Sequence, residues 1–273
     1  MKKIIVTFLF VFSLTTISAQ TYEDLVNRAM DYVEKEDYSA AEQALKAALR
    51  KEPGNPGNTM LMVNLGTVQR NLGELDDALL SYNIVLDKYP KIAFLRHNRA
   101  ALYCEMGQFD NAMKDYNAIL LSDPDDIEAL YRRGLLYLNT KNLFAADEDF
   151  DKMLELSPDN LLAQLGQSLI MKQRNEWEKA EKLYTELISK HKDVAELYFN
   201  RAECYLNLKK LARTQEDITK SVSLGYDDAS LYILRGQLRL AQYDKLSAKE
   251  DFNKAREKGA NQSTINNLLL LCK

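Results

Sequence analysis

The chain has 273 residues, of which 36 are Lys or Arg and 40 are Asp or Glu, so its formal net charge is −4. A nucleic-acid-binding protein normally carries a basic face or stripe. Here the basic residues are interspersed with acidic ones, which excludes nucleic acid as a partner. The length approaches the limit for one compact core, but an array of small units avoids that limit because each unit packs only on its neighbours.

Residues 1–19 have the order of a secretory signal peptide. Lys2 and Lys3 precede an apolar run from Ile4 to Phe12, and Ile17-Ser18-Ala19 forms the cleavage site. The alternative is an uncleaved signal anchor, but the run is shorter than the roughly 20 residues that span a bilayer. We therefore expect a periplasmic or secreted protein with no stable membrane span after cleavage. Cleavage would leave 34 basic and 40 acidic residues, a formal charge of −6.

From Tyr22 onward, a pair of helix patterns recurs seven times with a period of 34 residues. Each unit has a small residue at its eighth place and another twelve residues later. This pairing suits two helices that cross closely, because the side chains at the contact set an interaxial distance of roughly 8 to 10 Å. The eighth places hold Ala29, Gly66, Ala100, Gly134, Ser168, Ala202 and Gly236, and the later places hold Ala41, Ala78, Ala112, Ala146, Ala180, Thr214 and Ala248.

Each unit is predicted to be a helical hairpin. Apolar residues at helical spacing, a Gly between the helices and a Pro after the second are the start and stop signals of such a hairpin. A segment of this size is too small to fold unaided, so the units must stack. The predicted units are 22–55, 59–92, 93–126, 127–160, 161–194, 195–228 and 229–262.

Two irregular segments flank this pattern. Residues 53–58 insert three extra residues between the first two units, and their two Gly and two Pro residues predict a loop. Residues 263–273 are predicted to form a capping helix, on which Ile265, Leu268 and Cys272 cover the final hairpin. Leu270 and Leu271 cannot face the same way as those three residues, and they would either mediate association or belong to a frayed terminus.

The matched places resemble the tetratricopeptide repeat family, which has small residues at places 8, 20 and 27, aromatic residues near places 11 and 24, and Pro at place 32. The resemblance covers Tyr22 to Gln262. It implies an all-α fold, a right-handed superhelix or α-solenoid of about seven hairpins plus the C-terminal cap. The sequence departs from the pattern at Lys192, Tyr226 and Ala260, where the family has Pro.

Four units have an Arg at place 7 together with an Asp at place 23. Other units lack both, except that Arg28 in the first unit faces Ala44. We predict an ion pair across each of the four hairpins, with a role in register more than in net stability. The predicted pairs are Arg99–Asp115, Arg133–Asp149, Arg201–Asp217 and Arg235–Asp251.

No pattern in the chain predicts catalysis, a metal or a cofactor. His97 and His191 lie far apart, and the chain has no glycine-rich phosphate loop, zinc-protease motif or serine-nucleophile motif. Trp177 occupies a turn place that is apolar in other units, and we interpret it as core packing. Cys104, Cys204 and Cys272 are expected to be free thiols, because the first two are about three repeats apart.

The resemblance also implies a binding surface. In this family the concave face is lined by places 2, 5, 6, 9, 12 and 13 of the first helices, and an Asn at place 6 contacts a bound peptide's backbone. An amide can donate and accept at once, which suits an extended peptide. Alternatively, the apolar side chains there pack against adjacent first helices. The candidate residues are Asn27, Asn64, Asn98, Tyr131, Arg132, Leu135, Leu138, Leu165, Leu169, Phe199, Asn200 and Leu206.

Members of the family that clamp a carboxylate at the C-termini of heat-shock chaperones are a poor match. Asn98 and Arg132 agree with that clamp, but Val63, Thr67 and Glu128 replace its Lys, Asn and Lys. Glu128 would repel an acidic tail, so we exclude that class of ligand.

The sequence therefore predicts a non-enzymatic scaffold of the cell envelope that grips an extended segment of a protein or peptide partner in a concave groove. A different role remains open, that of a structural spacer or assembly subunit that associates with itself through its terminal helix. A third hypothesis is an enzyme with an unrecognised site. The sequence identifies neither the partner nor the oligomeric state.

Overall fold

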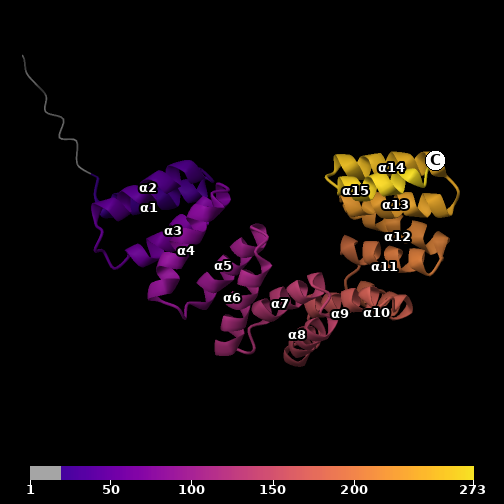
Figure 1. The fold of residues 1–273 in the computed structure, drawn as a ribbon, viewed down its shortest axis with the longest axis horizontal. Coiled ribbons are helices and arrows are strands. Elements are labelled where there is room, and N and C mark those ends of the chain that lie inside the picture. Colours follow the sequence, from indigo (N-terminus) through magenta and orange to yellow (C-terminus); the bar gives the residue numbers. More distant parts are fainter. Residues whose placement is uncertain (1–19) are drawn as a thin grey trace, which may run out of the picture. The chain divides into compact units, whose positions relative to one another are not determined.

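The computed structural model describes residues 20–273, and within this range the regular structure is entirely helical (Figure 1). The predicted signal peptide, residues 1–19, lies outside the described residues. The helices are α1 Tyr22–Glu34, α2 Tyr38–Lys51, α3 Asn58–Asn71, α4 Leu75–Lys88, α5 Ala93–Glu105, α6 Phe109–Ser122, α7 Ile127–Asn139, α8 Leu143–Leu156, α9 Leu161–Gln173, α10 Trp177–Lys190, α11 Ala195–Asn207, α12 Leu211–Ser223, α13 Ala229–Ala241, α14 Lys245–Glu257 and α15 Gln262–Leu270.

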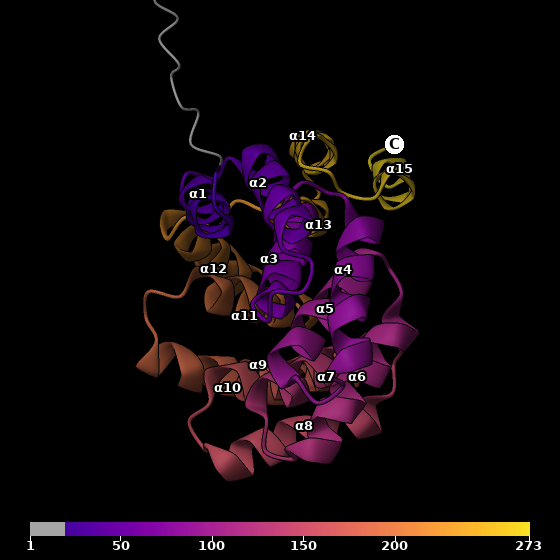
Figure 2. The same cartoon turned by 90° about the vertical axis from the view of Figure 1, so that its left-hand side faces the viewer.

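The chain divides into two units, of which unit 1 ends at Asp115 and unit 2 begins at Tyr116, within α6. In unit 1, α1 packs on α2, α2 on α3, α3 on α4, and α4 on α5; these helices face the viewer in Figure 2. In unit 2, every helix from α7 to α15 packs on the next one along the chain. The all-α repeat fold predicted from the 34-residue period is therefore confirmed.

Small residues at place 8 make room for an aromatic ring from the second helix of the same hairpin. A Cβ atom on Gly66 would lie 2.5 Å from the Tyr82 ring, and one on Gly134 would lie 2.8 Å from the Phe150 ring. Gly166, on the first helix of the next repeat, is equally close to the same Phe150 ring, at 2.6 Å. Phe150 is fully buried as a result. These contacts explain why the sequence alternates small and aromatic residues at fixed places.

The turn inside each hairpin places one residue in the left-handed backbone region. This residue is at place 15 in all seven units, and only Gly73 and Gly107 are glycines, which adopt that conformation without strain. The other five are Glu36, Lys141, Asn175, Lys209 and Tyr243. The repeat geometry therefore overrides the local preference of these residues.

Helix α15 ends the described array. Ile265 is fully buried against a cluster that includes Phe252 and Ala255 of α14, and Leu268 and Cys272 pack against the same cluster. Leu270 and Leu271 point away from it and are 56% and 59% exposed. Across residues 20–273, no helix combines the length and the apolar character that a membrane span needs.

Candidate binding site

All four predicted Arg–Asp pairs are in contact in the structure. In each pair a guanidinium nitrogen lies 2.6 to 2.7 Å from the carboxylate of the Asp on the second helix of the same hairpin. The four Asp residues are buried. The hydrogen bond from Arg133 to Asp149 raises the pKa of the Arg133 guanidinium above its ordinary value. These pairs join the two helices of one repeat.

A second set of polar contacts, which the sequence did not predict, joins consecutive repeats. Arg99 Nη1 donates to Asn83 Oδ1 at 2.7 Å, and Arg133 Nη1 donates to Asn117 Oδ1 at 2.8 Å. Both acceptors stand at place 25 of the preceding repeat. That regular spacing was the signal that could have revealed them.

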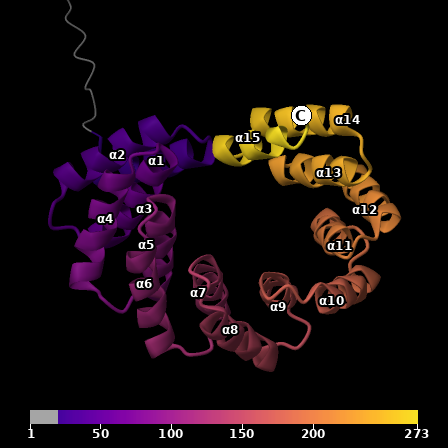
Figure 3. The same cartoon turned by 45° about the vertical axis from the view of Figure 1, so that its right-hand side comes forward.

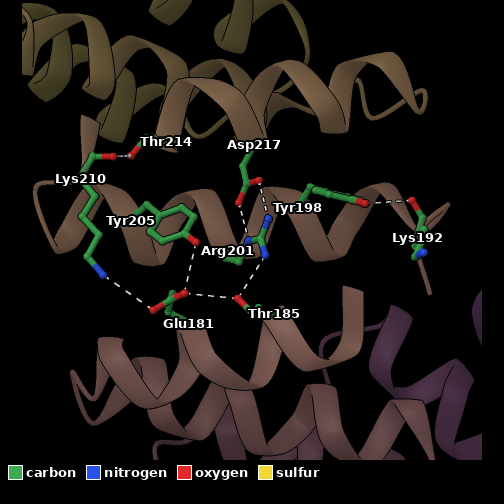
Figure 4. A network of polar contacts seen from close by, with 9 residues as sticks. All are labelled: Glu181, Thr185, Lys192, Tyr198, Arg201, Tyr205, Lys210, Thr214 and Asp217. Carbon is green, nitrogen blue, oxygen red and sulfur yellow. Dashed lines mark hydrogen bonds and ion pairs between the residues drawn. The ribbon is translucent and has the colours of Figure 1, made fainter. Parts of the chain in front are cut away.

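Other repeats use different residues at the same two places. Gln167 Nε2 donates to Asp151 Oδ1 at 2.6 Å, so the unit that lacks the Arg still makes the link to the preceding repeat. Arg201 Nη1 donates to Thr185 Oγ1 at 3.1 Å while its Nε and Nη2 atoms bind Asp217 (Figure 4). At Arg99, Arg133 and Arg201, place 7 therefore couples its own hairpin to the one before it.

The first helices of unit 2, α7, α9, α11 and α13, lie on one side of their hairpins, and α8, α10, α12 and α14 lie on the other (Figure 3). We call the first side the first-helix face. A pocket of about 660 Å³ opens beside α7 and α9. It is lined by Leu135, Leu138, Asn139, Lys141, Leu143, Leu169, Lys172, Gln173, Trp177 and Glu203.

Three predicted groove residues, Leu135, Leu138 and Leu169, meet in this pocket. Leu143 and Trp177 extend the apolar wall. Trp177 packs against the core cluster around Tyr184, as predicted, and it also lines the pocket. Its interpretation as core packing was therefore incomplete. Its place at the first turn of α10 gave no sign in the sequence that the side chain would also line a pocket.

A polar group lies at one end of the pocket. The Lys172 ammonium donates to Asn200 Oδ1 at 2.9 Å and forms an ion pair with Glu203. An ammonium group has three hydrogens to donate, so one remains beside the two that these partners occupy. The pocket thus combines an apolar wall with a hydrogen-bond donor, which is the usual composition of a ligand pocket.

The other predicted apolar residues of unit 2 are partly buried against neighbouring helices. Tyr131 lies against Phe150, with ring centroids 6.3 Å apart, and Phe199 stacks on Tyr226 at 4.6 Å. Leu165 and Leu206 pack against the core clusters of their own hairpins. Some of the predicted apolar residues therefore line the pocket, while Tyr131 packs on the second helix α8 and Phe199 on the turn before α13.

The asparagine prediction needs a correction at Asn200. Its side chain is buried, its Oδ1 accepts from Lys172, and its Nδ2 donates to the Glu196 carbonyl at 2.9 Å. Because each end of this buried amide already has one partner inside the protein, Asn200 positions Lys172. The sequence could not show this, because the contact depends on how closely α9 approaches α11.

The remaining predicted polar residues lie elsewhere. Asn64 and Asn98 are half-buried on α3 and α5 of unit 1, and Asn64 Nδ2 lies 3.9 Å from the Met30 sulfur. Arg132 on α7 is exposed, and its Nε lies 3.8 Å from the Glu128 carboxylate. Neither Arg132 nor the two asparagines line the pocket.

The buried titratable groups near α9 and α11 are held in their neutral forms. Burial raises the pKa of the Cys204 thiol to about 12 and also raises that of the Tyr184 hydroxyl. The nucleophilic form of a cysteine is the thiolate, which such a pKa disfavours at neutral pH. Within residues 20–273, no three His, Cys, Asp or Glu side chains are grouped so that they could hold a metal ion.

Comparisons with known proteins point to one repeat family. Sequence models of the tetratricopeptide repeat match residues 26–91, 95–126, 127–160 and 171–213. No curated protein matches the chain.

Several solved structures are similar. A tetratricopeptide repeat protein from Parabacteroides merdae has 42% identity and a TM-score of 0.84, over 93% of this chain and 99% of that one. PilW, a type IV pilus biogenesis factor, has 17% identity and a TM-score of 0.64, over 79% of this chain and 100% of that one. PilF from Pseudomonas aeruginosa has 14% identity and a TM-score of 0.60, over 78% and 96%.

Proposed function

Because this chain belongs to the tetratricopeptide repeat family, whose fold generally serves as a scaffold for protein–protein interaction, we propose that it binds a protein partner through the first-helix face of unit 2. The pocket beside α7 and α9 receives a bulky apolar side chain from an extended segment of that partner. The single observation that carries this proposal is the meeting of Leu135, Leu138, Leu169 and Trp177 around one open pocket.

The chemistry of the pocket fits a peptide better than a charged small molecule. Its apolar wall buries a side chain, which contributes about 25 cal/mol for each Å² removed from water. The Lys172 ammonium, held by Asn200 and Glu203, donates its free hydrogen to a backbone carbonyl of the partner. Glu203 neutralises Lys172, and the other charged residue of the lining is Lys141, which is exposed in the turn between α7 and α8.

The site of action proposed here is the cell envelope. It rests on the composition of residues 1–19, where two lysines, an apolar run and a small-residue cleavage site follow the order of a signal peptide. The partner would then be a component of an envelope complex, and the role is that of a scaffold without catalytic activity.

A peptide array tests the binding site. The chain is applied to immobilised random decapeptides as wild type and as Leu169→Lys, which brings a charge into the pocket wall. We expect wild type to select peptides with Leu, Phe or Trp, and the variant to lose that set about tenfold or more, as for a hot-spot residue.

A matched control on another surface is Leu246→Lys, because Leu246 is 73% exposed on α14 and does not line the pocket. This control should select the same peptides as wild type. If Leu169→Lys, still folded by circular dichroism, binds the wild-type set with unchanged strength, the pocket is not the binding site.

A further inference from the structure

In unit 2, a specific set of residues forms the surface of one repeat that packs against the preceding repeat. We call the repeat that presents this surface the receiving repeat. There, Asn117, Leu120 and Leu121 of α6 line a pocket of about 470 Å³ together with five residues of the receiving repeat. Asn117 accepts its hydrogen bond from Arg133, and Leu120 is buried. The five receiving residues stand at places 4, 7, 22, 23 and 26, and they are Leu130, Arg133, Glu148, Asp149 and Lys152.

The first repeat has the same receiving surface on α1 and α2. Its residues at those five places are Leu25, Arg28, Gln43, Ala44 and Ala47, and all of them line a pocket of about 460 Å³. Of the described residues before α1, Gln20 alone contributes to the lining. We call this surface the first-repeat groove.

Arg28 distinguishes the groove from the internal contacts. Four later repeats have an arginine at place 7, and each of these arginines binds the Asp at place 23 of its own repeat. Three of the four also donate a hydrogen bond to the place-25 residue of the preceding repeat. Ala44 takes the place of that Asp here, and Arg28 is exposed without an ion pair or hydrogen bond to residues 20–273. The groove therefore presents an exposed guanidinium beside the small apolar side chains of Ala40, Ala44 and Ala47, with Lys46 and Arg50 also in the lining.

A helix with matching chemistry is exposed on the same chain. Asn267 and Leu270 of α15, with Leu271 at its C-cap, repeat the Asn-x-x-Leu-Leu sequence of residues 117–121. Residues at this spacing share one helix face, and all three are exposed, while Ile265 on the opposite face is buried. An Asn and a Leu three residues apart also meet an arginine in unit 1, where Asn83 binds Arg99 and Leu86 is buried.

We propose that the first-repeat groove binds α15 of a second copy of this chain. The Asn267 amide oxygen accepts from the Arg28 guanidinium, and Leu270 packs against Leu25 and Ala44. The contact reproduces between two chains the one that α6 makes with the following repeat. It uses neither the pocket nor any residue of the peptide-binding proposal, so either proposal can fail alone.

Such a contact joins different surfaces of the two copies, so it is heterologous. Each copy that joins retains a groove or an α15 for the next, and heterologous contacts therefore form rings or open filaments instead of stopping at a dimer. The proposal predicts a series of oligomers that grows with protein concentration.

Sedimentation velocity of the full chain at rising concentration tests this. We expect wild type to associate, and Arg28→Glu and Asn267→Arg each to weaken association about tenfold or more, the usual effect of losing a hydrogen bond to a charged group. Both residues are exposed, so neither change disturbs the fold. The double variant, with opposite charges facing each other, should associate again.

Lys35→Glu is the matched control, because Lys35 is exposed on the same unit and does not line the groove. It should associate as wild type does. Wild type that remains a single chain at all concentrations would overturn the proposal, and so would two single variants that both associate normally.

Discussion

At the residue scale, the polar pairs are the contacts most sensitive to change. Asp149 is buried, and Arg133 holds it through two hydrogen bonds of 2.6 and 2.9 Å. A buried pair adds little net stability, but the removal of one partner leaves the other unsatisfied. The structure therefore predicts that single changes in these pairs are costly even where the pair itself contributes little.

Asp149→Ala should lower the free energy of unfolding by about 2 kcal/mol, since it removes charge-assisted hydrogen bonds. Arg133→Ala should lower it more, because the carboxylate that remains is the more deeply buried partner. Urea unfolding measures both, with Asp110→Ala as the exposed control. A loss for Asp149→Ala no greater than for that control would show that the pair has no structural role.

A pH-dependent contribution is expected at Glu105. The hydrogen bonds from Arg70, at 3.0 Å, lower the pKa of the Glu105 carboxyl below its ordinary value. A carboxyl with a lowered folded-state pKa stabilises the protein above its unfolded pKa of about 4.3 and loses that effect as the pH falls through the folded value. The stabilisation is below about 1 kcal/mol, because both side chains are partly exposed.

Thermal unfolding of wild type and Glu105→Gln should therefore differ slightly at pH 7 and coincide near pH 3, where the wild-type carboxyl is protonated, as expected for a group of this pKa. Glu250→Gln, at an exposed position of α14, is the control. A difference between Glu105→Gln and wild type that is as large at low pH as at neutral pH would exclude this ion pair as its source.

At the element scale, the sequence was most informative where the period was regular. The small residues at places 8 and 20 predicted each hairpin, because those places serve the contact within one repeat, whereas the left-handed turn residue at place 15 is a glycine in only two of the seven units. The pocket beside α7 and α9 was only partly predicted, since Lys172 and Glu203 meet across two repeats. Contacts of that kind depend on the angle between hairpins, which no single unit of sequence encodes.

A destabilising substitution in the terminal helix α15 should lower the stability of the helices next to it before that of the rest of unit 2. Ile265→Ala removes a fully buried side chain and should cost about 2 to 4 kcal/mol in local stability. In a repeat array each unit interacts with its neighbours alone, so hydrogen exchange should accelerate in α14 and α13 before the rest of unit 2. Ser263→Ala, at an exposed position of α15, is the control. Equal acceleration throughout unit 2 would contradict this local coupling.

At the scale of the whole molecule, the chain offers surfaces of two different kinds. The pocket on unit 2 combines apolar side chains with the ammonium groups of Lys141 and Lys172, which suits a segment of another protein. The first-repeat groove and the exposed face of α15 instead match each other, as two incomplete copies of an internal contact. A scaffold that binds a partner and also assembles with itself would use both surfaces at once.

The most direct test of the central claim is a crystal structure of the protein with a peptide selected on the array. The account predicts an apolar side chain of the peptide between Leu169 and Trp177, with a peptide carbonyl within hydrogen-bond distance of Lys172 Nζ. A peptide bound on α8, α10 or α12, with the pocket beside α7 and α9 empty, would contradict it.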